Sequence, residues 1–123
     1  MSQDGVVLVA DDEEDILALV GTVLRGAGFE VVEARDGAEA LALARERTPR
    51  AAVLDVSMPE LDGLEVLQRL REAPETRELP VILLSALAQE ADVARGYHAG
   101  AARYVRKPFR PAELVAAVRE VVG

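Results

Sequence analysis

The stretch VVLVADDEED, residues 6–15, decides the fold. It opens with five apolar residues in a row, a pattern typical of a strand that is buried on both faces. Acidic residues follow without a break, and apolar residues then recur from Ile16 to Leu24 at helical spacing. Because a buried strand leads directly into an amphipathic helix, we expect a parallel sheet whose strands alternate with helices.

The same alternation continues along the chain. Further apolar runs predict strands at residues 29–34, 51–54, 81–84 and 102–106. Gly26 and Gly28 are expected to end the first helix, and Pro111 to begin the last one. Asp36 with Glu39 is a capping-box signature for the second helix. We therefore expect one domain of residues 1–123, α/β in class, with a doubly wound sheet and right-handed crossovers.

Composition narrows the classes of protein. The chain has 123 residues, a formal net charge of -8 and no cysteine, which excludes disulfide frameworks and thiolate sites. A single histidine, His98, argues against a histidine-rich metal site. No apolar run reaches the ~20 residues of a membrane span, and the N-terminus lacks the basic start of a secretory signal. An acidic chain is also poorly suited to nucleic acid. We expect a cytoplasmic domain that binds neither membrane nor nucleic acid.

Polar residues follow four of the five predicted strands. They are Asp11 and Asp12 after the first strand, Asp55 after the third, Ser85 after the fourth and Lys107 after the fifth. The carboxyl ends of the strands form the functional rim of a doubly wound sheet. Each residue alone has a simpler interpretation, because either aspartate of the pair could cap a helix, the serine could be a turn residue and the lysine a solvated charge. Lys107 is the only lysine in the chain, which makes its position informative.

Three converging carboxylates repel one another unless positive charge offsets them. Lys107 supplies one charge, and a divalent cation with oxygen ligands, such as Mg²⁺, would supply more. A metal ion beside a carboxylate, an ammonium group and a hydroxyl suits a phosphoryl group. Asp55 is the best candidate for a nucleophile. The expected ligands are Asp12, Asp55 and a backbone carbonyl just past Asp55, with Asp11 acting directly or through water.

Four segments together resemble the receiver domain of bacterial response regulators, of the chemotaxis-regulator type, over essentially the whole chain. In chain order they are VADDE at 9–13, VLDVSMP at 53–59 with DG at 62–63, LSA at 84–86, and GAARY at 100–104 with KPF at 107–109. Each segment alone is weak evidence, whereas all four in this order are highly specific. The resemblance implies a flavodoxin-like (βα)5 three-layer sandwich with the strand order 2-1-3-4-5.

The resemblance also implies a function, that of a phosphoacceptor switch in a two-component phosphorelay rather than an enzyme. Asp55 would accept the phosphoryl group. Mg²⁺ would be held by Asp11, Asp12, Asp55 and the backbone carbonyl of Ser57, and Lys107 would pair with Asp55 or its phosphate. The implied donor is a sensor histidine kinase or a histidine phosphotransfer protein that docks near the first helix.

The resemblance also implies how phosphorylation changes the surface that a partner binds. Ser85 would bind a phosphoryl oxygen in the active state, and Tyr104 would be the switch aromatic that turns into the space this frees. The surface of helix 89–99, strand 102–106 and the last helix would then change and meet a downstream effector protein or output domain. The peptide bond before Pro108 is usually cis in this family.

A few positions depart from the family pattern or need a separate expectation. An acidic residue often precedes the switch aromatic, whereas Ala102 and Arg103 stand there in this chain. Leu87, two residues past Ser85, occupies a position that resembles one tuning dephosphorylation in this family. Its side chain cannot hydrogen-bond an attacking water, so we expect slow self-dephosphorylation. In the weakly apolar fourth helix, Tyr97 is expected to pack inward and His98 to lie on the surface.

Three other functions share part of this pattern. A receiver-like interaction module that no longer takes phosphate would share the fold, although the intact set of site residues argues against it. An aspartyl phosphatase of the haloacid-dehalogenase type needs an Asp-x-Asp pattern after the first strand and room for a cap domain. A flavodoxin-like cofactor carrier needs a hydroxyl- and glycine-rich phosphate loop there, where this chain has DDEED.

Overall fold

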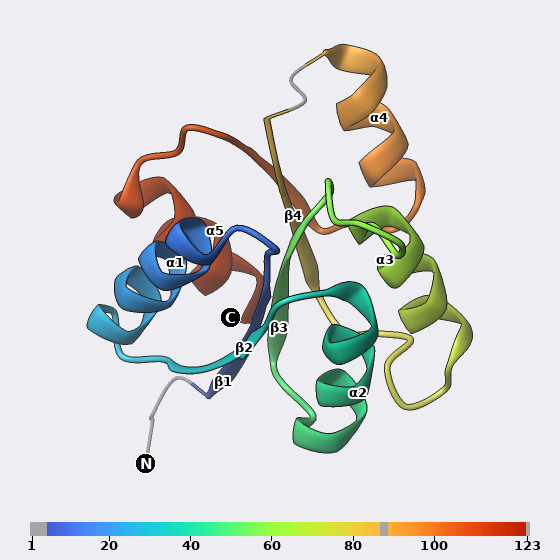
Figure 1. The fold of residues 1–123 in the computed structure, drawn as a ribbon, viewed down its shortest axis with the longest axis horizontal. Coiled ribbons are helices and arrows are strands. Elements are labelled where there is room, and N and C mark those ends of the chain that lie inside the picture. Colours follow the sequence, from blue (N-terminus) through green and yellow to red (C-terminus); the bar gives the residue numbers. More distant parts are fainter. Residues whose placement is uncertain (1–4, 87–88, 123) are drawn as a thin grey trace.

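Five strands alternate with five helices in the computed structural model, which describes residues 5–86 and 89–122 (Figure 1). The strands are β1 (Val6–Ala10), β2 (Glu30–Ala34), β3 (Ala51–Asp55), β4 (Val81–Ser85) and β5 (Arg103–Arg106). The helices are α1 (Glu14–Gly26), α2 (Gly37–Arg47), α3 (Gly63–Glu72), α4 (Glu90–His98) and α5 (Pro111–Val122). Within these described ranges, no helix combines the length and apolarity needed to span a membrane.

The strands form one parallel sheet in the order β2-β1-β3-β4-β5. Figure 1 shows α1 and α5 on one side of the sheet and α2 and α3 on the other. The expected three-layer sandwich and strand order are therefore confirmed. β2 lies at one edge, as its weaker apolar pattern predicted, and β5 lies at the other.

The core consists of two apolar clusters, one on each face of the sheet. Val7 and Val9 of β1 pack into the cluster that contains residues of α1 and α5. Leu8 and Ala10 point the other way, into the cluster that contains residues of α2 and α3. Because neighbouring side chains of a strand alternate between faces, a strand covered on both sides needs apolar residues at every position. This explains the unbroken apolar run of β1.

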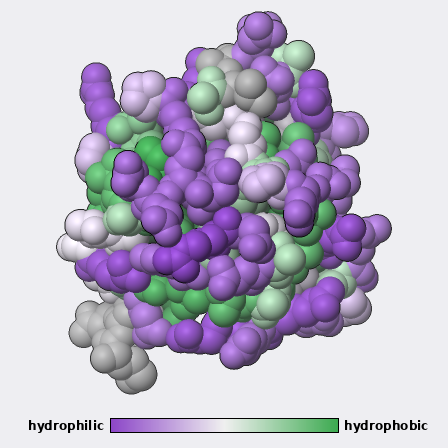
Figure 2. Space-filling model, viewed as in Figure 1, coloured by the Kyte–Doolittle hydropathy of each residue, from purple (hydrophilic) through white to green (hydrophobic). Residues whose placement is uncertain are grey.

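Ion pairs border the edge strand β2. Glu33 pairs with Arg25 of α1 at 3.1 Å, and Glu30 pairs with Arg47 of α2 at 2.9 Å. Figure 2, drawn from the same side as Figure 1, shows a mainly hydrophilic surface. Charged side chains along an edge strand discourage pairing with a second chain, so this edge is protected against edge-to-edge association.

The start of α1 excludes the capping interpretation of the acidic pair. Glu13 occupies the N-cap position, and its side chain makes no capping hydrogen bond. Asp11 and Asp12 therefore do not serve as its N-cap. The other expected ends are confirmed, since α1 ends at Gly26 and α5 begins at Pro111.

The complete capping box lies at α3 rather than at α2. Asp36 does cap α2, because its side chain accepts a hydrogen bond from the Glu39 amide at 2.8 Å. The Glu39 carboxylate, however, accepts from the amide of Arg35 rather than from that of Asp36, so the expected box is only half formed. At α3, Asp62 and Glu65 make both reciprocal bonds, at 2.9 and 3.2 Å. This box fixes the entry to α3 directly after the loop that follows β3.

Candidate functional site

The sheet brings the predicted polar residues to one rim. Asp11 directly follows β1, Asp55 and Ser85 are the last residues of β3 and β4, and Lys107 directly follows β5. The strands are parallel and in register, with Asp55 opposite Leu84. Their carboxyl ends therefore deliver these side chains to one place, as the alternation of strands and helices predicted.

Asp11, Asp12 and Asp55 form an acidic cluster. Each contributes a carboxylate oxygen, and these oxygens all lie within 4.8 Å of one another. Asp11 is 1% exposed and Asp55 is 2% exposed, whereas Asp12 lies on the surface. The amide of Glu13 donates to Oδ1 of Asp11 at 2.9 Å and fixes that carboxylate. Mutual repulsion in a poorly hydrated site makes this cluster unfavourable without positive charge.

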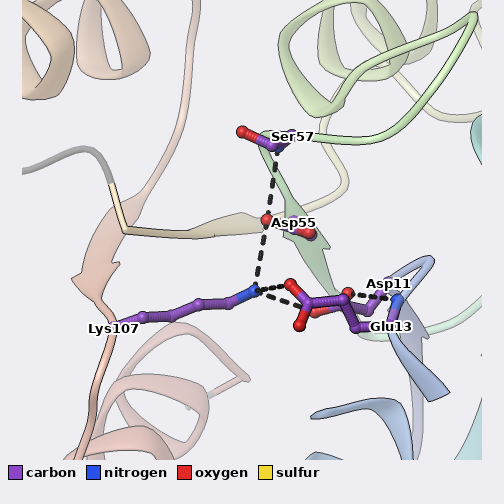
Figure 3. A network of polar contacts seen from close by, with 5 residues as sticks. All are labelled: Asp11, Glu13, Asp55, Ser57 and Lys107. Carbon is purple, nitrogen blue, oxygen red and sulfur yellow. Dashed lines mark hydrogen bonds and ion pairs between the residues drawn. The ribbon is translucent and has the colours of Figure 1, made fainter. Parts of the chain in front are cut away.

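Lys107 supplies positive charge to the cluster (Figure 3). Its Nζ lies 3.2 Å from Oδ2 of Asp11, 3.5 Å from Oδ1 of Asp55 and 3.8 Å from Oε1 of Glu13. Its side chain is only 14% exposed, so the alternative of a solvated surface charge is wrong. The Lys107 amide donates to the carbonyl of Ser85 at 2.8 Å, and the Lys107–Pro108 bond is cis, as the resemblance implied.

The pKa values reflect this crowding. The pKa of Asp55 is raised from 3.8 to about 6, first by burial and then by repulsion from Asp11, while Lys107 opposes the rise. Burial alone would lower the pKa of Lys107, but its attraction to Asp55 and Asp11 outweighs burial and raises that pKa above the ordinary value. Lys107 therefore stays charged at neutral pH, and Asp55 carries its negative charge at a cost in free energy.

Asp55 is held by its own loop but keeps one oxygen available. The amide of Ser57 donates to Oδ1 of Asp55 at 3.3 Å. Gly63 allows the loop to return close to β3, because a Cβ at this position would lie 2.4 Å from the backbone oxygen of Asp55. The other carboxylate oxygen, Oδ2, is buried and has no hydrogen-bond partner within the described part of the chain. A buried oxygen without a partner is costly, and a ligand in the cluster would relieve that cost.

The donor set fits a hard divalent cation. Three carboxylates converge, one of them exposed to solvent, and the buried Oδ2 of Asp55 lacks a partner. Mg²⁺ prefers such oxygen ligands and completes its coordination with water. Ser57 lies two residues past Asp55 in the chain, and the resemblance implied that its backbone carbonyl is a further ligand.

Ser85 lies on β4, the strand beside that of Asp55, and Tyr104 lies on β5, the next strand outward. Ser85 is fully buried and follows Leu84, the residue paired with Asp55. Tyr104 is half-buried in β5, opposite Leu83 of β4. A serine and an aromatic residue thus lie on adjacent strands, and Tyr104 lines the same cleft as Asp12, an arrangement compatible with the switch that the resemblance implied.

A cleft of about 530 Å³ opens beside the acidic cluster. Asp12, Ser57 and Met58 line its side toward β3, and Asp92 and Tyr104 line its side toward α4. The cleft therefore connects the cluster to α4, the helix in which the sequence analysis placed the output.

One member of the site was missed from the sequence. Glu13 contacts Lys107 and thereby competes with the two buried aspartates for its charge. The signal was present, because Glu13 continues the acidic run after Asp11 and Asp12, but its side chain was assigned no role. Leu87, on which the expectation of slow dephosphorylation rests, lies outside the described residues.

Comparison with known proteins agrees with this geometry. The family model for the response regulator receiver domain matches residues 7–119. The transcriptional regulatory protein PrrA of Mycobacterium tuberculosis is 48% identical over 116 residues, which cover 94% of this chain and 49% of PrrA. The chain therefore belongs to the response regulator receiver domain family of two-component systems. It spans about half the length of the curated relatives it matches, several of which are named as transcriptional regulators.

Solved structures show the same fold. A putative response regulator from Chloroflexus aurantiacus has a TM-score of 0.92 and 37% identity, covering 96% of this chain and 97% of that one. The receiver domain of the Pseudomonas aeruginosa sensor histidine kinase PA1611 has a TM-score of 0.89 and 28% identity, covering 97% and 98% of the two chains. That structure has a magnesium ion coordinated in its active-site cleft.

Proposed function

We propose that this domain is a phosphorylation switch that accepts one phosphoryl group on Asp55 and requires Mg²⁺. The observation that supports this most directly is the buried Oδ2 of Asp55, which has no partner in the described chain and lies among Asp11, Asp12 and Lys107. A nucleophile needs a lone pair that no hydrogen bond occupies, and this oxygen accepts none within the described residues.

Asp11, Asp12, Asp55 and the backbone carbonyl of Ser57 would hold the metal ion. When bound, Mg²⁺ supplies positive charge that neutralises phosphoryl oxygens. The exposed position of Asp12 gives this site contact with solvent. Lys107, whose Nζ already lies 3.5 Å from Oδ1 of Asp55, contributes a further positive charge.

The transfer step needs no further reactant. A carboxylate oxygen of Asp55 attacks the phosphorus of a phosphohistidine, an O–P bond forms and the N–P bond breaks. The imidazole leaves with the bonding electron pair and takes a proton from solvent. The domain thus ends as an acyl phosphate, and the only catalytic activities proposed for it are its own phosphorylation and dephosphorylation. The donor is a sensor histidine kinase or a histidine phosphotransfer protein.

The signal then passes to the surface of α4, β5 and α5. Ser85 hydrogen-bonds a phosphoryl oxygen, and Tyr104 turns into the space that this movement opens. A change from mostly inactive to mostly active protein needs ~3–5 kcal/mol of differential stabilisation. A few charge-assisted hydrogen bonds to phosphate are enough to provide it. By analogy with PrrA, the changed surface controls an output domain or a partner in transcription.

Intact mass measurement after incubation with acetyl phosphate and Mg²⁺ tests this proposal. The wild-type protein should gain the mass of one phosphoryl group, and Asp55→Asn should gain none. Asp92→Asn is the matched control, since it removes a carboxylate that lines the same cleft but lies outside the acidic cluster. It should be phosphorylated like the wild type.

Two results would contradict the proposal in different ways. Phosphorylation of Asp55→Asn, or phosphorylation that does not depend on Mg²⁺, would move the phosphoacceptor elsewhere. Failure of the wild type to gain any phosphoryl group would favour an interaction module that works without phosphorylation.

The lifetime of the phosphoryl group is a separate prediction. Leu87 offers no hydrogen bond to an attacking water, so the phosphorylated domain should lose its phosphoryl group slowly. Replacing Leu87 by Asn should shorten the lifetime, as followed by intact mass over time. A half-life of only seconds in the wild-type domain would contradict this prediction.

A further inference from the structure

Tyr97 of α4 does not pack inward as its sequence position suggested. The residue is 43% exposed, and its hydroxyl oxygen accepts a hydrogen bond from the backbone N–H of Tyr104 at 3.2 Å. Tyr104 belongs to β5, which is the edge strand of the sheet on the side away from β2. Tyr97 therefore reaches from α4 to the outer edge of the sheet and binds a backbone donor there.

The residue before Tyr97 contacts the same tyrosine of β5. A Cβ on Gly96 would lie 2.9 Å from Cδ2 of Tyr104 and 2.9 Å from Cδ1 of Leu83. Gly96 is the one buried residue of α4. The helix thus meets Tyr104 twice, through the ring beneath Gly96 and through the backbone amide that binds Tyr97. An element with so little buried surface depends strongly on such single contacts.

The neighbouring residue of β5 makes the corresponding connection to α5. Arg103 hydrogen-bonds Glu120 of α5. The pKa of Arg103 is raised, chiefly by Glu120 and to a smaller extent by the Tyr97 hydroxyl. Arg103 therefore joins β5 to α5, and Tyr104 joins β5 to α4.

We propose that Tyr97 is a positioning residue whose hydroxyl holds α4 on the backbone of Tyr104 in the unphosphorylated domain and thereby restrains the switch. The switching role of Tyr104 rests on the proposed function, whereas the contact itself does not. Removal of the hydroxyl takes this hydrogen bond away from the Tyr104 amide and loosens α4 without removing the aromatic ring. The restraint on the active arrangement then falls, and a larger fraction of the domain reaches it before phosphorylation.

The expected effect is moderate because one neutral hydrogen bond is lost at a half-exposed position. Such a bond changes an equilibrium by roughly two- to tenfold. If the active arrangement is the form that accepts the phosphoryl group, the rate of phosphorylation rises by the same factor. A purely structural role for Tyr97 would instead lower stability and leave this rate unchanged or reduced.

Amide hydrogen exchange of Tyr104, measured by NMR without Mg²⁺ or phosphate donor, tests the contact directly. In Tyr97→Phe this amide should exchange roughly two- to tenfold faster than in the wild type. Glu120→Gln is the matched control, since it weakens the pair with Arg103 and keeps the Tyr97 hydroxyl. Its Tyr104 amide should exchange as in the wild type. Unchanged exchange in Tyr97→Phe, or equal acceleration in both variants, would overturn the assigned role.

The rate of phosphorylation by acetyl phosphate with Mg²⁺ tests the restraint on the switch. Tyr97→Phe should be phosphorylated roughly two- to tenfold faster than the wild type. Faster amide exchange with an unchanged or lower phosphorylation rate would overturn the restraint and leave only a structural contact. If the wild type itself accepts no phosphoryl group, the proposed function fails together with the switching role, while the exchange data still decide the contact.

Discussion

Asp55 carries a negative charge in a place that disfavours it. Its pKa of about 6 exceeds the ordinary 3.8 because of burial and the nearby Asp11. Between these two pH values the folded chain keeps a proton that the unfolded chain has already lost. The stability contributed by protonated Asp55 is therefore fully present below about pH 4 and is lost as the pH rises through 6. At neutral pH, folding includes the cost of ionising this group.

Asp55→Asn should consequently stabilise the domain at neutral and higher pH. A shift of about two units corresponds to roughly 3 kcal/mol in the free energy of unfolding. The gain should appear at about pH 8 and vanish near pH 4, as measured by urea unfolding without divalent cations. Asp92→Asn, outside the acidic cluster, should show no such pH-dependent gain. An Asp55→Asn protein that is no more stable than wild type at pH 8 would contradict the electrostatic account.

Added Mg²⁺ should stabilise the wild-type domain more than a variant that lacks one ligand of the acidic cluster. A tenfold excess over its Kd stabilises a binding-competent domain by about 1.4 kcal/mol. Thermal unfolding with and without Mg²⁺ should show this gain for the wild type and a smaller one for Asp12→Asn, which loses a ligand on the solvent side of the cluster. Chelation with EDTA should reverse the gain. Equal gains in both proteins would place the cation elsewhere.

At the scale of elements, the turn from β3 into α3 depends on one close approach. Gly63 starts α3 and donates its amide to the carbonyl of Val56 at 3.0 Å. It also lies against the backbone of Asp55, where any side chain would overlap. The position of the helix and that of the acidic cluster are therefore linked through backbone atoms, which cannot move aside as a flexible side chain can.

Gly63→Ala should destabilise the domain by about 1–3 kcal/mol, because the added methyl group overpacks this turn. It should also weaken the stabilisation by Mg²⁺, since Asp55 would shift. Gly26→Ala is the matched control, because no atom lies within 4 Å of a Cβ at that position in α1. That variant should be neutral or gain up to about 1 kcal/mol. Chemical denaturation of both variants would measure the difference, and equal stability would refute the steric argument.

Arg71 connects α3 to the loop before β4 and to the turn after α4, at the end of the sheet opposite the acidic cluster. Its guanidinium, at the end of α3, donates to the carbonyls of Arg77 and Gly100, each at 3.0 Å. Burial lowers its pKa, and the carbonyls replace the lost water. The loop before β4 and the turn after α4 are thereby fixed to the same side chain. α4 is thus anchored by its C-terminal end, while its N-terminal end is near the cleft.

Arg71→Ala should cost about 2 kcal/mol, since hydrogen bonds from a charged donor contribute more than neutral ones. Arg69→Ala, which removes an exposed arginine of the same helix, should change stability by less than about 0.5 kcal/mol. Urea unfolding at neutral pH separates the two cases. A loss for Arg71→Ala no greater than that for Arg69→Ala would show that the carbonyl contacts contribute little.

At the scale of the whole molecule, the sheet separates two apolar clusters. Val66 belongs to the cluster beside α2 and α3, and Val118 to the cluster beside α1 and α5. Changing either residue to alanine should cost about 2 kcal/mol in unfolding free energy. Because the clusters lie on opposite faces, the double variant should lose the sum of the two costs within about 0.5 kcal/mol. A larger deviation would show that packing on one face is transmitted through the sheet.

The fold and the acidic cluster could be predicted because they depend on patterns along the chain. A strand covered on both faces must be apolar throughout, and a parallel arrangement then places Asp11, Asp55 and Lys107 on one rim. The roles of single side chains were harder to predict, since they depend on which face of a helix meets the sheet. Tyr97 was expected to pack inward, but α4 approaches the sheet through Gly96 and leaves its neighbour at the edge.

Local hydrogen bonds were predicted least well. Two stretches carried the same pattern of aspartate and glutamate, yet only Asp62 with Glu65 formed the reciprocal pair. At α2 the Glu39 carboxylate accepts instead from the amide of Arg35, the residue before the N-cap. The two N-cap residues differ in φ, which is -154° at Asp36 and -78° at Asp62, and no pattern of residue types specifies that angle.

Because the chain has a single lysine, a reagent that modifies amines can probe the site selectively. The chain has one ε-amino group, that of Lys107, and it points into the acidic cluster. Apart from the N-terminus, an amine-acylating reagent has no other primary amine to modify. Ion pairing with Asp11 and Asp55 keeps this amine protonated and hence poorly nucleophilic. Its acylation rate therefore reports how often Lys107 separates from these carboxylates, and no engineered probe is needed.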